Sequence, residues 1–193
     1  MNRILCAAIL FFGLAACSKN DETVKGPGVS AYHEYIIPKG AHYAAGNNFR
    51  ILETRSLHFK ARFDSSCIYT TTLPENASDI NKLYGFSDCG SDHQENSARF
   101  GWLWNRRAIE LYAYCYGEGR RTSKLLGTVD IGQEVELSLV AGQGKYVFTV
   151  NGKRDDSMKR SCSNEKDAAY QLFPYFGGDE VAPHDVRVYI KDL

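Results

Sequence analysis

Two neighbouring segments of the chain carry aromatic side chains at alternate positions, a spacing suited to binding a flat, partly apolar ligand. In residues 108–116, a strand would direct one set of alternate side chains to each face. One face would carry Ile109, Leu111, Ala113 and Cys115, and the other Glu110, Tyr112, Tyr114 and Tyr116. In residues 98–104, the alternate residues Phe100, Trp102 and Trp104 are aromatic. Such rows are typical of surfaces that stack on the C–H faces of sugar rings.

We therefore predict a ligand-binding surface on these two segments. Its residues are Trp102, Trp104, Arg106, Glu110, Tyr112, Tyr114 and Tyr116. The charged members would supply the polar partners that sugar hydroxyls need. The alternative is that both aromatic rows belong to a protein core, because strands favour aromatic residues for packing alone. Truncating a buried aromatic would cost about 3–5 kcal/mol of stability, whereas truncating a stacking residue would mainly reduce affinity.

Two acidic segments offer oxygen ligands for a cation. They are residues 87–96, with Asp88, Asp92 and Glu95, and the later group of Asp179, Glu180 and Asp185. Calcium binds six to eight oxygens, but neither segment has EF-hand spacing, and exposed polar turns are the alternative. The histidines show no metal-ligand spacing. We predict no catalytic residue, no metal ligand and no cofactor, with calcium left as an open alternative.

The cysteines indicate an oxidising compartment. Outside the N-terminal region the chain has four, namely Cys67, Cys89, Cys115 and Cys162. An even number in an exported chain predicts disulfides, and no pair has the C-x-x-C spacing of a zinc or redox site. Three pairings can be drawn. We favour Cys67 with Cys89, because the segments around them could form a hairpin, which leaves Cys115 with Cys162.

The N-terminal region predicts export. Arg3 precedes an apolar run, residues 4–16, that is too short for a transmembrane helix. The run ends in Leu14-Ala15-Ala16-Cys17, which resembles the lipobox of bacterial lipoproteins. The resemblance implies cleavage before Cys17 and a lipid on its thiol, which would anchor the protein to a membrane. A plain signal peptide with an incidental cysteine is the alternative.

The next residues, 18–22, resemble the short acidic signal that sends some lipoproteins to the outer face of the outer membrane; a solvated tether is the alternative. We therefore expect a bacterial outer-membrane lipoprotein, with the cell surface as a further expectation. The predicted organisation is a signal peptide over 1–16, a lipidated tether over 17–30 and one domain over 31–193.

Composition excludes several other classes. The 193 residues carry 23 Lys and Arg against 23 Asp and Glu, so the formal net charge is zero. A nucleic-acid-binding domain would need a basic surface, so nucleic acid is excluded as a partner. Beyond residue 16 no stretch is apolar enough to span a bilayer.

Short alternating segments predict an all-β fold. The expected strands are residues 32–37, 57–63, 82–86, 98–104, 108–116, 124–130, 134–140, 145–150, 170–175 and 186–190. Asn151-Gly152 predicts a type I′ hairpin turn after the strand 145–150, because both residues tolerate a positive φ. So many short antiparallel strands indicate a two-sheet β-sandwich of the jelly-roll type.

Two segments carry a family resemblance. Residues 134–153, with the Asn151-Gly152-Lys153 turn, resemble a strand hairpin of laminin G-like and other concanavalin A-like jelly rolls, and residues 172–190 are similar to the final strand pair. The resemblance implies a two-sheet antiparallel β-sandwich, on which lectins, glycosidases, lyases and adhesion modules are all built.

The resemblance also indicates where enzymes of this fold would carry their catalytic residues. Laminarinase-type members use Glu-x-Asp-x-x-Glu on one strand, and here Glu134 and Glu136 lack the third acid. Alginate-lyase-type members use a late tyrosine segment, and residues 175–179 lack its basic residue and its second tyrosine. We therefore predict a non-catalytic domain that binds a polysaccharide or a surface protein. The alternatives are a divergent lyase or hydrolase and a structural or protective lipoprotein.

Overall fold

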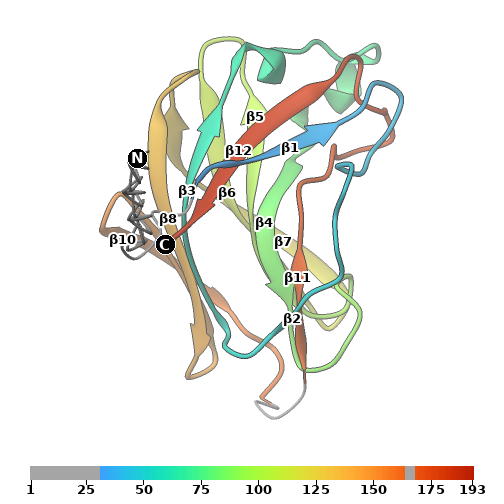
Figure 1. Ribbon diagram of the computed structural model, residues 1–193. Coiled ribbons are helices and arrows are strands. Elements are labelled where there is room, and N and C mark those ends of the chain that lie inside the picture. Colours follow the sequence, from blue (N-terminus) through green and yellow to red (C-terminus); the bar gives the residue numbers. More distant parts are fainter. Residues whose placement is uncertain (1–30, 164–167) are drawn as a thin grey trace, which may run out of the picture.

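The computed structural model describes residues 31–163 and 168–193. The predicted signal peptide and tether, including the lipidation residue Cys17, lie outside the described residues. The described chain forms two six-stranded antiparallel sheets packed face to face (Figure 1). This confirms the predicted β-sandwich. Within the described ranges, no helix has the length and apolar character needed to cross a membrane.

The first sheet has the strand order β1-β12-β3-β8-β9-β10. Its strands are β1 (His33–Ile37), β12 (Val186–Asp192), β3 (Ser56–Phe63), β8 (Glu134–Gly142), β9 (Lys145–Val150) and β10 (Lys153–Lys159). The second sheet has the order β2-β11-β4-β5-β6-β7. Its strands are β2 (Ile51–Leu52), β11 (Ala169–Leu172), β4 (Asn81–Ser87), β5 (Ser97–Trp104), β6 (Ile109–Gly117) and β7 (Arg120–Val129). Two short 3₁₀ helices, η1 (Ser65–Cys67) and η2 (Pro74–Ser78), lie between β3 and β4.

All ten predicted strands are present, and the chain adds β2 and β10. Asn151 and Gly152 have φ angles of 49° and 76° and connect β9 to β10, so the predicted hairpin turn is confirmed. The strand predicted over 170–175 ends earlier, at Leu172. Pro174 lacks a backbone N–H, so the sheet ladder is interrupted there. Pairing with β4 resumes at Tyr175, which exchanges backbone hydrogen bonds with Lys82.

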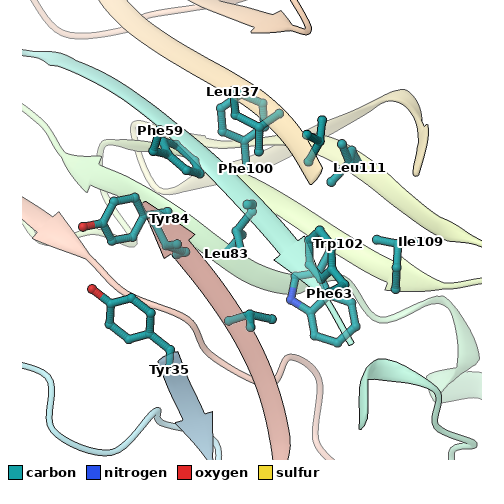
Figure 2. Packing of buried hydrophobic residues seen from close by; sticks show 14 of the residues in the cluster. Tyr35, Phe59, Phe63, Leu83, Tyr84, Phe100, Trp102, Ile109, Leu111 and Leu137 are labelled. Carbon is teal, nitrogen blue, oxygen red and sulfur yellow. The ribbon is translucent and has the colours of Figure 1, made fainter. Parts of the chain in front are cut away.

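The core fills the space between the sheets with aromatic and aliphatic side chains. On β3, alternate residues are buried: Leu57, Phe59, Ala61 and Phe63. Trp102 of β5 is fully buried against Phe63, with ring centroids 5.5 Å apart (Figure 2). Each large side chain buried in this way contributes about 1.5–3 kcal/mol, so the two sheets are held together mainly by apolar contact.

The disulfide pairing differs from the prediction. Cys89 is bonded to Cys162, 73 residues later, and Cys67 and Cys115 are free, buried thiols. The predicted pairs are wrong because η1 places Cys67 in the core, and because Cys115 lies on the core-facing side of β6. Cys89 follows β4 and Cys162 follows β10, so the bond links one sheet to the other.

A buried ionic network lies beside the disulfide. Asp88 accepts hydrogen bonds from Arg160 Nε at 2.6 Å, Arg55 Nε at 2.8 Å and Tyr146 Oη at 2.9 Å. Burial opposes ionisation of Asp88, but the hydrogen bonds from Arg160, Arg55 and Tyr146 together hold its pKa below its ordinary value. The network thus keeps a carboxylate charged inside the protein and joins the start of the β4–β5 loop to the end of β10.

Candidate functional site

A cavity of about 490 Å³ lies on the outer face of the second sheet. Its lining comes from strands β4, β5, β6 and β11, from the β4–β5 loop and from the segments before β2 and after β11. Its polar and aromatic lining includes Tyr43, Asn47, Lys82, Asp92, His93, Gln94, Arg99, Tyr114, Tyr116, Tyr170 and Tyr175. The volume falls in the range of small-ligand sites, about 300–1,000 Å³. We call this the sheet cavity.

Strand alternation directs the floor residues of the sheet cavity away from the core. On β5, Ala98 and Phe100 are core residues, so Arg99 between them points to the outer face. On β6, Tyr114 lies between the core residues Ala113 and Cys115. The strand register places Arg99 directly opposite Tyr114, so the two side chains are cross-strand neighbours.

On the other side, Arg99 is paired with Gly85 of β4. A Cβ atom added at Gly85 would collide with the Cβ of Arg99 and with the backbone of Ala98. The absence of a side chain at this position therefore leaves the room that Arg99 needs on the cavity floor.

Arg99 and Lys82 make the floor positively charged. Arg99 is only 6% exposed, and its Nε is buried without a hydrogen-bond partner among the described residues. The guanidinium carbon lies 6.0 Å from the centroid of the Tyr114 ring, and Lys82 Nζ lies 5.0 Å from the same centroid. Lys82 Nζ also lies 5.5 Å from the centroid of the Tyr175 ring. Within the described ranges, neither cation has a carboxylate at ion-pair distance.

The pKa values of the floor residues follow from burial and from like charges. Desolvation, with Arg99 and Arg121 nearby, lowers the pKa of Lys82 to about 8, against a smaller opposing effect of Asp79. Burial, together with the neighbouring Tyr116, raises the pKa of Tyr114 to about 12. At neutral pH the floor therefore presents cations beside a neutral, hydrogen-bonding phenol.

One wall of the cavity holds a histidine and a tyrosine in contact. Tyr170 Oη accepts a hydrogen bond from the backbone N–H of His93 at 3.0 Å, and it lies 3.4 Å from His93 Nδ1. Burial and Arg99 lower the pKa of His93, although Asp92 opposes the shift. His93 is therefore neutral at pH 7, when one of its ring nitrogens can accept a proton.

Aromatic rings at the rim are exposed. Tyr43 is 71% exposed and packs edge-on against Tyr175, with ring centroids 4.9 Å apart. Phe49 is 77% exposed and packs against Tyr170 at 5.7 Å. Exposed rings held by a second ring are rigid apolar surfaces, and here they stand beside a cavity with polar groups.

The structure divides the seven sequence-predicted binding residues. Tyr114 and Tyr116 line the sheet cavity. Trp102 is fully buried in the core and Trp104 packs against it, so their prediction as one binding surface with the tyrosines is corrected: the tryptophans share the core-facing side of β5, opposite to the tyrosine face. Trp104 and Arg106 instead line a second, smaller cavity of about 240 Å³.

Glu110 and Tyr112 lie on the tyrosine face of β6 without lining the sheet cavity. Tyr112 Oη donates a hydrogen bond to Glu110 Oε2 at 2.5 Å, and Asn105 Nδ2 donates to Glu110 Oε1 at 2.8 Å. The carboxylate is thus engaged by the protein itself. The pair extends the polar surface of β6 toward its N-terminal end.

Sequence reasoning missed the residues that give the cavity its charge. Alternation in residues 98–104 identifies Arg99 as the outward neighbour of Phe100. The same rule would have placed Lys82 on the core side with Tyr84 and Phe86, because the register shift between Lys82 and Tyr84 in β4 cannot be read from the sequence. His93 reaches the cavity from the β4–β5 loop, Tyr43 from the segment before β2, and Tyr170 from β11. No local pattern in the sequence brings those three residues together.

Three of the acidic residues considered for calcium accept hydrogen bonds from protein donors. Asp88 lies in the buried ionic network described above. Glu180 accepts hydrogen bonds from the backbone N–H groups of Thr72 and Leu73, both at 2.8 Å. Asp185 accepts one from the backbone N–H of Lys39 at 3.0 Å. Asp88, Glu180 and Asp185 are therefore each engaged by donors of the protein.

No protein-family model matches the sequence, and no curated protein matches it either. Solved structures do match. A GH16 protein of the Bacteroides ovatus mixed-linkage glucan PUL, solved with a product, has a TM-score of 0.53 at 12% identity, over 87% of this chain and 83% of that chain. An alginate lyase has a TM-score of 0.56 at 9% identity, over 84% of this chain and 74% of that chain.

A third structure comes from work on endo-acting O-glycanases of human gut microbiota that initiate mucin breakdown. Its TM-score is 0.53 at 9% identity, over 88% of this chain and 82% of that chain. At such low identity the likeness concerns the fold alone. Together with the two antiparallel sheets, it shows that the described chain has the concanavalin A-like jelly-roll fold.

Proposed function

We propose that this protein binds a glycan in the sheet cavity. The observation that carries the proposal is the rim: Tyr43 is exposed and held edge-on by Tyr175, beside a cavity with charged and hydroxyl groups at its floor. Sugar rings need both kinds of surface, an apolar one for their C–H faces and a polar one for their hydroxyls. The similar structures, which include a glucan-bound GH16 protein and an alginate lyase, support a glycan as the ligand class.

The proposal is tested by electrophoresis in native gels that contain single polysaccharides. Tyr43→Ala and Tyr175→Ala should each weaken binding by about 1–3 kcal/mol, because each removes an aromatic anchor. Tyr189→Ala is the matched control, since Tyr189 lies on the outer face of the first sheet and contacts Arg62 there. Equal retardation of all three variants and the unaltered protein would contradict binding at the rim.

A hydrolase with paired carboxylates is not supported by the cavity. Retaining hydrolysis needs two carboxyl groups about 5–5.5 Å apart. Asp92 is the one acid among the described residues that line the sheet cavity, and its side chain is 65% exposed. We therefore propose glycan binding without hydrolysis as the primary function.

A polysaccharide lyase is the second candidate, and the contact between His93 and Tyr170 favours it. A neutral histidine and a tyrosine are suited to moving protons at a bound sugar, and both line the same cavity as Arg99. The test is incubation with polysaccharides followed by ultraviolet detection of unsaturated products. Product formed by the intact protein and lost in His93→Ala would establish the lyase, and absence of product from bound polysaccharide would exclude it.

We further propose that Cys17 carries a lipid that holds the protein at the outer membrane. The lipobox-like sequence Leu14 to Cys17 supports this proposal. Cys17→Ala should move the protein from the detergent phase to the aqueous phase in a partition experiment, whereas Cys6→Ala should leave it in the detergent phase. Retention of Cys17→Ala in the detergent phase would contradict the lipid anchor.

A further inference from the structure

Arg99 is a buried cation that the described protein leaves without an opposite charge. Its side chain is buried, and its neighbours across the sheet are Gly85 and Tyr114. A charge taken out of water costs several kcal/mol unless a partner compensates it, so such groups are normally paired. The tyrosine ring face offers a weak cation–π contact at 6.0 Å and no full counter-charge.

Lys82 places a second cation over the same tyrosine. Its Nζ lies 5.0 Å from the centroid of the Tyr114 ring and 5.5 Å from that of the Tyr175 ring. Lys82 Nζ lies 5.0 Å and the guanidinium carbon of Arg99 lies 6.0 Å from the centroid of the Tyr114 ring, so the two cations share one region of the cavity floor, where both would attract the same anion. Arg121 of β7 adds a third positive charge near Lys82, while Asp79 at the end of η2 adds a negative one.

The polar groups around the two cations suit an anion as well. Tyr114, Tyr116 and Tyr170 line the cavity with phenol groups, which donate hydrogen bonds while they are protonated. Burial raises the pKa of Tyr114 to about 12, so its hydroxyl remains a donor across the neutral range. The carboxylate of Asp92 lies 3.6 Å from His93 Nδ1 on the wall, and among the described residues it forms no ion pair with Arg99 or Lys82.

We propose that the floor of the sheet cavity, through Arg99 and Lys82, binds a carboxylate or sulfate group of the glycan, so that the ligand is an acidic polysaccharide. This inference rests on the proposed glycan-binding function and specifies the class of glycan. Arg99 would form the directional contact, since a guanidinium matches the two oxygens of a carboxylate or sulfate, and Lys82 would add charge.

The experiment compares three kinds of polysaccharide in native gels with the intact chain. Alginate and polygalacturonate supply carboxylates, dextran sulfate and carrageenan supply sulfates, and mixed-linkage glucan and dextran are neutral. We expect retardation by at least one acidic polysaccharide, weakening as sodium chloride is added because the contact is ionic. Whether the carboxylated or the sulfated gels retard the protein identifies the anion.

Three variants locate the contact. Arg99→Met and Lys82→Met should each weaken binding to the acidic polysaccharide by about tenfold or more. Arg62→Met is the matched control: it removes one positive charge from the outer face of the first sheet, where Arg62 lies over Tyr32 and Tyr189, and should change binding less than twofold. Thermal unfolding of each variant confirms that it is folded, and Lys82→Met tests the inference independently if Arg99→Met fails to fold.

Two results overturn the inference and separate it from the proposed function. Binding to a neutral glucan that is unchanged in Arg99→Met and Lys82→Met would leave glycan binding in place and remove the anion site. Equal loss of binding in Arg62→Met and Arg99→Met would show attraction by overall charge and no specific site. Retardation by none of the polysaccharides would instead remove the proposed function itself.

Discussion

Arg160 and Arg99 are both almost completely buried, and the protein surrounds them differently. Arg160 donates to both oxygens of Asp88, with Nε–Oδ2 at 2.6 Å and Nη2–Oδ1 at 3.1 Å. Arg99 faces aromatic rings and a glycine, and its Nε has no hydrogen-bond partner among the described residues. Arg160 therefore carries its counter-charge within the fold, whereas the counter-charge of Arg99 has to come from solvent or from a ligand.

The same contrast distinguishes the outer faces of the two sheets. On the first sheet, basic side chains stand next to acids: Lys60 contacts Glu134 at 2.5 Å and His58 contacts Glu136 at 2.9 Å. On the second sheet, Lys82 and Arg99 face tyrosines. Paired charges on an exposed sheet face mainly keep that face soluble. Cations that line a cavity without an ion-paired acid are typical of a site that recognises a charged group.

The largest expected effect comes from removing the counter-charge of Arg160. Asp88→Ala would remove the carboxylate that pairs with Arg160, which would make Arg160 comparable to Arg99. It would also remove a hydrogen-bond acceptor of Arg55 and Tyr146. We expect a loss of about 3–5 kcal/mol in the free energy of unfolding, measured in urea. Asp92→Ala is the control, because Asp92 is exposed. A loss below about 1 kcal/mol for Asp88→Ala would show that the network is not structural.

The second effect concerns the disulfide next to that network. A double variant with Cys89→Ser and Cys162→Ser should lose about 2–4 kcal/mol, because the unfolded chain is no longer constrained by a 73-residue loop. Mass spectrometry of unreduced protein after alkylation in denaturant should find Cys67 and Cys115 labelled and Cys89 and Cys162 unlabelled. Labelling of Cys89 and Cys162 would contradict the pairing.

A smaller effect, dependent on pH, is expected from Lys82. Its pKa is about 8 in the folded state and 10.5 when unperturbed, so between these values the unfolded chain binds more protons. Lys82 therefore opposes folding below pH 8, and this cost is relieved as the pH rises from 8 to 10.5. As the pH rises from 7 to 10, the intact protein should therefore gain stability relative to Lys82→Met. A difference that is constant with pH would contradict the shift.

The smallest effect on stability is expected at Arg99 itself. Arg99→Met removes a buried charge without breaking an ion pair, so the free energy of unfolding should stay within about 1 kcal/mol of the original or rise. Denaturation in urea without ligand measures this. A loss comparable to that of Asp88→Ala would mean that Arg99 has a structural role like that of Arg160, and the contrast between the two arginines would fail.

The fold could be predicted because each strand carries its own evidence. The alternation in β3 and the Asn151-Gly152 turn follow from local backbone preferences, which neighbouring residues determine. The sheet cavity could be predicted only in part. Tyr114 and Tyr116 belong to one alternating strand, but Tyr43 and Tyr175 meet only because distant segments pair at the sheet edge. The same reason explains the wrong disulfide pairs: Cys89 and Cys162 come together through sheet packing and not through a hairpin.

The pairing of β1 with β12 has a consequence for folding. β12 lies between β1 and β3: its Ile190 pairs with His33 of β1, and its Val188 pairs with Phe63 of β3. During synthesis, β1 and β3 therefore lack their shared neighbour in the first sheet until β12 has been made. Pairings between such distant residues form slowly, and unpaired strand edges invite association between chains. We expect refolding to be slow and to need dilute protein, with protection of the β1 amides from hydrogen exchange among the last to develop.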